Sequence, residues 1–171
     1  MSVSSTAAPT TSSVEAAITA YRAAGESADA DAVAELLAPD VVFNSPLTAR
    51  VRFEGREDVV ALHRDIFAVV EDIHTTEPLA LGDTRAFTFH ARVRGVELQA
   101  MNLVRFNEQG QIVELRVFAR PLPAVATLFA TLPPRVVARR RGRLTGALVA
   151  SLARPLAFAL RTVDRMVPRF L

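Results

Sequence analysis

Three residue types are missing from this chain of 171 residues: cysteine, tryptophan and lysine. Without cysteine there are no disulfide bonds, no thiolate metal sites and no cysteine nucleophile. Without lysine there is no Schiff-base chemistry of the usual kind and no phosphate-binding loop that depends on a lysine. All 20 basic side chains are therefore arginine, which stays charged at any physiological pH.

Charge is unevenly distributed along the chain, although the formal net charge is only +2. Residues 1–120 hold 11 arginines against 17 acidic residues, and residues 121–171 hold nine arginines against one acidic residue. Half of the residues are hydrophobic, which excludes a chain that is disordered throughout. The length allows one domain with an appendage. We therefore expect a disordered lead-in at 1–11, a domain at 12–121 and a basic helical tail at 122–171.

Hydrophobic periodicity changes along the predicted domain from a helical repeat to strict alternation. Apolar residues first recur every three or four positions, and from about residue 73 they recur at every second position. The pattern predicts a helix at about 12–25, a short helix capped by Asp29 or Asp31 and ending before Pro39, a helix at 56–71, and strands at 41–45, 73–81, 84–94, 96–106 and 111–119. This order predicts an α+β fold, in which helices lie on one face of a curved, mostly antiparallel sheet.

Two polar residues in apolar surroundings are candidate catalytic residues. Tyr21 is the only tyrosine and lies on the apolar stripe of the first helix. Asn102 interrupts an apolar row on the strand 96–106, where burying an unpaired amide costs about 1–3 kcal/mol. We expect each to contact a ligand, and the alternative is a partner within the protein or water.

His63 and His90 are the candidate acid–base residues, because histidine titrates near neutral pH. His63 lies on the third predicted helix. His90 shares a strand face with Thr88 and Arg92, which favours solvent or a subunit interface as the alternative. No two histidines have the spacing of metal ligands, so we expect no metal site.

Further residues are predicted to line an apolar cavity. Ser45 shares its strand face with Val41 and Phe43, and capping of a turn is the alternative role for its hydroxyl. For most of the phenylalanines the alternative is simple core packing. The predicted ligand-binding residues are Ser45, Phe43, Phe67, Phe87, Phe89 and Phe118.

The tail is a cationic amphipathic sequence. Leu144, Leu148 and Leu152 recur at helical spacing, with arginines largely off this stripe. One interpretation is a helix on an anionic membrane surface, and the other is a helix packed on the domain or on a second subunit; nucleic acid is disfavoured because no aromatic residues are interleaved. The arginines predicted to bind a membrane or partner are Arg139, Arg140, Arg141 and Arg143. Because residues 1–11 lack the pattern of a signal peptide, we expect a cytoplasmic protein, free or peripheral at the membrane.

Three stretches carry a family resemblance: AAITAYRAAGESADADAVAELLAPDVVFNSP, FEGREDVVALHRDIF and NLVRFNEQGQIVELRVFA. With the order of elements, residues 14–119 resemble the nuclear transport factor 2-like superfamily, in particular its SnoaL-like and ketosteroid-isomerase-like members. The resemblance implies a cone whose open end holds an apolar pocket, and a homodimer. It is specific for fold rather than activity, because this fold hosts isomerases, cyclases, hydrolases, dehydratases and non-enzymes.

The resemblance to ketosteroid isomerases extends to individual positions. Those enzymes have an oxyanion-donating tyrosine on the first helix, where this chain has Tyr21. Their aspartate base precedes the proline that closes the first strand, and here Ser45 precedes Pro46. Their second oxyanion donor, a neutral carboxylic acid, corresponds to Asn102. One of the three residues is retained, and a serine without a partner base does not remove a proton from carbon.

Two functions are therefore expected. The first is binding of a small apolar, oxygen-bearing molecule whose oxygen is polarised by Tyr21 and Asn102. As an enzyme, such a protein would be a cofactor-independent isomerase, cyclase or dehydratase that transfers a proton next to a carbonyl, with His63 or His90 as the base. The second is a non-catalytic dimeric interaction module that the arginine-rich tail targets to a membrane surface or a partner.

Overall fold

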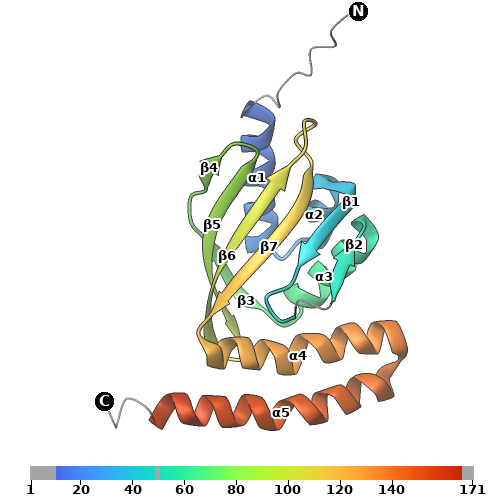
Figure 1. The fold of residues 1–171 in the computed structure, drawn as a ribbon, viewed down its shortest axis with the longest axis vertical. Helices are drawn as coiled ribbons and strands as arrows, with labels where there is room; N and C mark the ends of the chain where they lie inside the picture. The colour runs from blue at the N-terminus through green and yellow to red at the C-terminus, as the bar shows by residue number, and fades with distance from the viewer. Residues whose placement is uncertain (1–10, 49–50, 167–171) are drawn as a thin grey trace, which may run out of the picture.

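The computed structural model describes residues 11–48 and 51–166, so most of the predicted lead-in lies outside the described residues. These residues form five helices and seven strands (Figure 1). The helices are α1 (Thr11–Glu26), α2 (Ala30–Leu36), α3 (Arg56–Phe67), α4 (Leu122–Arg141) and α5 (Arg143–Met166). The strands are β1 (Leu37–Asn44), β2 (Arg52–Glu54), β3 (Glu71–Thr75), β4 (Leu79–Leu81), β5 (Thr84–Val93), β6 (Val96–Phe106) and β7 (Ile112–Arg120).

The strands form one curved sheet in the order β2-β1-β7-β6-β5-β3, and β4 pairs with β5. β1 runs parallel to β7, and the other pairs are antiparallel. Figure 1 shows α1, α2 and α3 on one face of the sheet, with α4 and α5 stacked across one end. This arrangement confirms the predicted α+β fold with its helical C-terminal extension.

Local chemistry explains where several elements begin and end. Asp29 caps α2, because its side chain accepts hydrogen bonds from two backbone N–H groups of the first turn at 3.0 and 2.9 Å. The strand predicted at 73–81 is two strands, β3 and β4, since Pro78 lies between them and has no N–H to donate to a ladder. α3 ends at Phe67 rather than at 71, and the chain turns there into β3.

One hydrophobic core fills the space between the sheet and the helices. Ile18 of α1 and Leu62 of α3 are almost fully buried in it. α4 contributes Leu128, Leu132 and Val136 to this same core. The first helix of the predicted tail therefore packs on the domain, and residues on both sides of the boundary predicted after residue 121 share one core.

Ion pairs hold α4 against α3. Arg139 Nε donates to the carboxylate of Asp65 at 2.9 Å, and Asp65 is only 7% exposed. Arg140 donates to Asp58 at 2.5 Å, and its guanidinium lies 5.0 Å from the centre of the Phe53 ring. Arg139 and Arg140 thus bind acidic residues of α3 within the chain, and their predicted contact with a membrane or partner stays a prediction.

α5 packs along α4 through small residues. A β-carbon at Gly146 would lie 2.6 Å from the carbonyl oxygen of Pro134 and 2.7 Å from the β-carbon of Ala138, so the two helices approach closely there. The same pattern continues along the pair of helices. A second buried cluster between them consists of Ala126, Ala130, Ala153 and Ala157.

Candidate functional site

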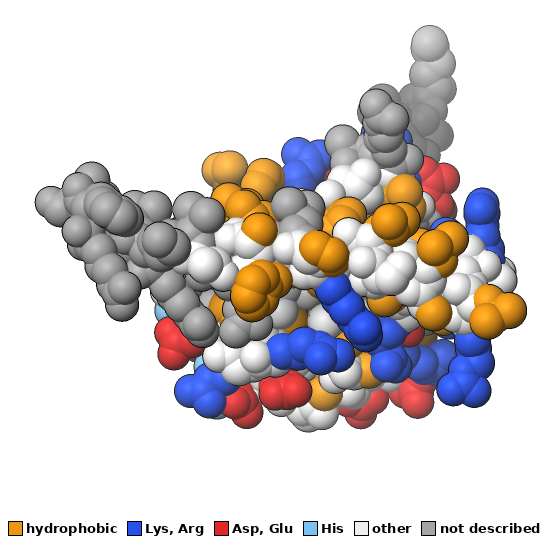
Figure 2. All heavy atoms as spheres, turned by 90° about the horizontal axis from the view of Figure 1, so that it is seen from below, with side chains coloured by type: hydrophobic (Ala, Val, Ile, Leu, Met, Phe, Trp, Pro, Cys, Tyr) orange, Lys and Arg blue, Asp and Glu red, His pale blue; other side chains and the backbone are white. Residues whose placement is uncertain are grey.

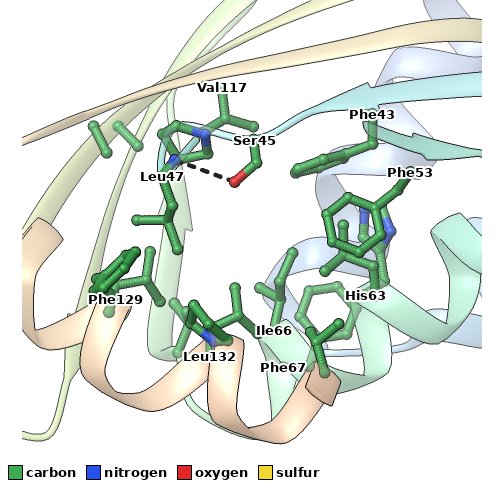
Figure 3. A pocket seen from close by; sticks show the side chains of 18 of the residues that line it. Phe43, Ser45, Leu47, Phe53, His63, Ile66, Phe67, Val117, Phe129 and Leu132 are labelled. Atoms are coloured by element: carbon green, nitrogen blue, oxygen red, sulfur yellow. Dashed lines mark hydrogen bonds between the residues drawn. The ribbon is translucent and has the colours of Figure 1, made fainter. Parts of the chain in front are cut away.

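A cavity of about 570 Å³ lies inside the cone, at the end covered by α4. This volume is within the range of roughly 300–1,000 Å³ that is usual for small-molecule sites. Figure 3 shows Phe43 and Phe53 facing Phe129 and Leu132 across an open space, with Ile66 between them. Strands and α1 form the walls of the cavity, α3 lines one side, and α4 closes the end. Most of the side chains in the lining are apolar.

Tyr21 and His63 form a hydrogen-bonded pair in the cavity wall. Tyr21 is 7% exposed and His63 is 3% exposed, and the Tyr21 Oη and His63 Nε2 atoms are 3.2 Å apart. His63 Nδ1 lies 2.8 Å from the carbonyl oxygen of Val59, which accepts only. Nδ1 therefore carries the ring proton, and Nε2 accepts from the Tyr21 hydroxyl.

Both members of this pair are neutral at physiological pH. Burial lowers the pKa of His63 to about 4, although its hydrogen bond to Val59 acts in the opposite direction. Burial raises the pKa of the Tyr21 hydroxyl well above its ordinary range. The pair thus presents an uncharged acceptor and an uncharged donor to an apolar space.

Asn102 lies on β6 and also lines the cavity. It is directly opposite Phe87 on β5, whose ring centre is 6.2 Å from that of Tyr21. Asn102 is 8% exposed, and its Oδ1 has no hydrogen-bond partner, which is true of no other fully buried side-chain nitrogen or oxygen in the described ranges. An unsatisfied buried acceptor costs about 1–3 kcal/mol, a cost that a bound donor would remove.

Ser45 and four of the predicted phenylalanines also line the cavity. Ser45 Oγ accepts a hydrogen bond from the backbone N–H of Leu47 at 3.1 Å, drawn as the dashed line in Figure 3. Ser45 therefore caps the turn after β1, which was the alternative interpretation, while its side chain faces the cavity. The phenylalanines in the lining are Phe43, Phe67, Phe87 and Phe89.

Two predicted site residues lie elsewhere. His90 is exposed on β5 and pairs across the sheet with His74 on β3, away from the cavity. Phe118 is 49% exposed, whereas its neighbours Val117 and Ala119 line the cavity. Side chains alternate between the two faces of a strand, so β7 cannot present both sets inward. The predictions of a cavity role for His90 and Phe118 are corrected accordingly.

α4 supplies cavity residues that the sequence analysis missed. Leu128, Leu132 and Val136 line the cavity at a spacing of four residues. That spacing could have predicted an apolar face of the helix directed at the domain, but the sequence analysis treated residues 122–171 as a unit separate from the domain. At the outer end of the cavity, Arg141 belongs to the lining, and Arg143 is exposed at the turn into α5.

Metal binding has no support in residues 11–48 and 51–166, where no group of three His, Asp or Glu side chains is placed to hold an ion. The polar groups of the cavity lining are a phenol, an imidazole, a carboxamide, hydroxyls and the side chains of Arg22, Arg140 and Arg141. Such a set can donate and accept hydrogen bonds and can pass protons. The catalytic roles of its members stay predictions.

Residues 18–115 match the family model described as the SnoaL-like domain. The match covers more than half of the chain. The chain belongs to the SnoaL-like family. The matched region ends within β7, so α4 and α5 of this SnoaL-like protein lie beyond it. No protein of curated function matches the sequence.

Solved structures resemble this SnoaL-like protein over most of their length. A steroid delta-isomerase from Pseudomonas aeruginosa is 26% identical, with a TM-score of 0.70, over 78% of this chain and 98% of that one. An uncharacterized protein with a cystatin-like fold from Silicibacter pomeroyi DSS-3 is 25% identical, with a TM-score of 0.69, over 73% and 88%. The epoxide hydrolase/cyclase-like enzyme SalBIII, at 18% identity and a TM-score of 0.55 over 64% and 92%, shares the fold. The fold is thus related to that of isomerases and cyclases.

Proposed function

We propose that this SnoaL-like protein binds a small, uncharged, mostly apolar molecule with a carbonyl or hydroxyl oxygen, and transfers a proton next to that oxygen without a cofactor. The observation that carries the proposal is the neutral Tyr21–His63 pair, which lines one apolar cavity together with the carboxamide of Asn102. The steroid delta-isomerase among its structural relatives supports an apolar, oxygen-bearing substrate class.

The absence of charge on the inner polar groups selects the kind of ligand. Tyr21, His63 and Asn102 are all neutral, and the guanidinium of Arg22, which also lines the cavity, is paired with Glu77, so a buried carboxylate or ammonium would meet no unpaired countercharge beside them. A carboxamide accepts from a hydroxyl at Oδ1 and donates to a carbonyl or enolate from Nδ2. The cavity therefore suits a ketone, an enone or an alcohol on an apolar skeleton.

His63 is the base in this proposal, because its Nε2 is unprotonated and lies in the cavity wall. A proton leaves the carbon next to the ligand carbonyl for Tyr21 Oη, while the Tyr21 proton passes to His63 Nε2. The electron pair of the broken C–H bond forms an enolate, whose oxygen accepts from Asn102 Nδ2. Return of the proton to another carbon completes an isomerisation, and its return to a departing hydroxyl, released as water, completes a dehydration.

Asn102→Leu separates a ligand role from a structural role. The leucine keeps the branched shape and the number of heavy atoms but has no unsatisfied acceptor, so the free energy of unfolding should rise by about 1 kcal/mol. Binding of the uncharged probe 5-androstene-3,17-dione, measured by equilibrium dialysis, should weaken by about five- to tenfold. Equal affinity of the variant and the parent would contradict the proposal.

Turnover of the same probe tests the proton transfer, because its isomerisation forms a conjugated enone that absorbs in the ultraviolet. Tyr21→Phe and His63→Gln should each lower the rate by about 100-fold or more. His90→Gln is the matched control, since His90 lies outside the cavity, and it should leave the rate unchanged. A rate that is insensitive to His63→Gln would remove His63 from the mechanism and leave a binding protein.

A further inference from the structure

The outward face of α5 carries large apolar side chains. Leu144, Leu148, Leu152 and Phe158 are 90%, 61%, 73% and 74% exposed, and together we call them the α5 stripe. Figure 2 views the molecule from the end that bears α5 and shows hydrophobic side chains gathered there, with arginine side chains beside them. At about 100° per residue, the four side chains fall within roughly a third of the helix circumference.

Packing among the described residues does not explain the α5 stripe. The inward face of α5 uses Gly146, Ala153 and Ala157 against α4, so the small residues are buried and the large ones are exposed. Burying a leucine side chain stabilises a folded protein, and three leucines of this helix stay exposed instead. A contiguous exposed apolar face of this kind marks a surface that binds something outside the chain.

Charge indicates what the α5 stripe binds. Arg143 and Arg154 are exposed on α5, and Arg141 is exposed at the preceding turn. The sequences of α4 and α5 hold eight arginines and one acidic residue, Asp164. Two copies of this chain meeting symmetrically at the stripe would bring these arginines together, whereas an anionic surface would pair with all of them.

We propose that α5 lies flat on an anionic lipid bilayer, with the α5 stripe among the acyl chains and the arginines at the level of the phosphates. Burial of the apolar side chains and attraction between the arginines and the anionic lipids both contribute to binding. The inference is independent of the proposed function. It also places the outer end of the cavity, which Thr145 and Val149 of α5 line, beside the lipid.

Lying on the surface fits α5 better than crossing the bilayer. The segment Arg143–Leu160 is long and apolar enough to span a membrane by length and composition, with a mean hydropathy of 1.2. Spanning would place Arg154 inside the hydrocarbon, at a cost of up to about 3 kcal/mol. It would also require α5 to leave α4, which covers its small-residue face.

Vesicle flotation of the full chain tests the proposal. The protein should float with vesicles of phosphatidylcholine and phosphatidylglycerol in equal amounts, and remain below vesicles of phosphatidylcholine alone. Leu148→Glu combined with Leu152→Glu should reduce flotation at least tenfold. Leu79→Glu combined with Leu81→Glu is the matched control, because these β4 leucines are 75% and 80% exposed but lie outside α5, and it should float like the parent.

Three results would overturn the proposal. The first is a parent protein that does not float with the anionic vesicles, and the second is an equal loss of flotation in both double variants. The third result is a parent dimer in light scattering that dissociates only in the Leu148→Glu, Leu152→Glu variant. The last result would assign the α5 stripe to a second copy. Thermal unfolding verifies that both variants are folded, which exposed positions should allow. Equilibrium dialysis of 5-androstene-3,17-dione with the same variants tests the proposed function separately from membrane binding. A variant that no longer floats should still bind this probe in the cavity.

Discussion

α4 and α5 are neighbouring helices of similar composition, yet they use their residues in opposite ways. α4 buries large side chains such as Leu128 and Leu132 in the core of the cone and pairs Arg139 with Asp65. α5 buries small side chains and exposes Leu148 and Leu152, and its described arginines have no acidic partner within the described chain. An arginine-rich amphipathic sequence therefore serves as a wall of the cavity in one helix and as an outer surface in the next.

The same substitution should have very different effects on the two helices. Leu132→Asp places a charge in the core, so the free energy of unfolding should fall by about 4 kcal/mol or more. Leu152→Asp changes an exposed position, so the shift should stay within about 0.5 kcal/mol. Urea unfolding measures both. A large loss in Leu152→Asp would mean that α5 is held by contacts of the stripe, against the structure described above.

Acid should weaken the cone but leave the outer helix unaffected. His63 is neutral in the folded protein with a pKa of about 4, and it titrates near 6.5 in an unfolded chain. Between these values the unfolded state binds more protons, so stability falls as the pH drops from about 6.5 to about 4, by up to about 3 kcal/mol. Flotation should not change over this interval, because the described charges of α5 are arginines.

Urea unfolding at several pH values checks the acid effect. His63→Gln should remove the pH dependence between about pH 6.5 and 5, below which Glu26 and Glu114, whose pKa values are lowered in the folded protein, also contribute. His90→Gln, at an exposed position, should retain the whole pH dependence. A parent protein whose stability is flat between pH 6.5 and 4 would show that His63 is not held neutral by burial.

The smallest expected effects on stability come from replacing two glycines, one with open space around it and one that lies close to a neighbouring helix. Gly25→Ala in α1 meets no atom within 4 Å and should stabilise the fold by about 0.5–1 kcal/mol. Gly146→Ala in α5 meets the carbonyl oxygen of Pro134 and should destabilise the α4–α5 pair by about 1 kcal/mol despite the better helix propensity. Thermal unfolding compares the two, and hydrogen exchange of α5 locates the second. Stabilisation by both would show that α4 and α5 are loosely packed.

Residue spacing alone predicted much of this fold. The alternation of β5 and β6 identified the inward row that contains Phe87 and Asn102, and both residues face the cavity. Asp29 was one of two predicted caps for α2, and it is the cap. Such features depend on neighbours within a few residues, which the sequence shows directly.

Features that depend on distant pairing were not predictable in the same way. Tyr21 and His63 were both candidates, but 42 positions separate them, and nothing local indicates that they share a hydrogen bond. Phe118 was selected by residue type, whereas the register of β7 against β6 decides which face it occupies. The sequence likewise did not show what the tail packs against. A helical repeat of leucines is the same whether its apolar face contacts the cone or a surface outside the chain.

The parallel pairing of β1 with β7 has a consequence for how the chain comes together. Asn44 lies beside Arg116, 72 positions later, so the middle of the sheet cannot close until more than two thirds of the chain has left the ribosome. Until then, β1 pairs with β2 alone and lacks its partner on the other side, which leaves part of its apolar surface uncovered. Contacts of such long sequence separation slow folding. Nascent chains of this protein should therefore depend on chaperones up to the synthesis of β7, and α4 then seals a sheet that has only just formed.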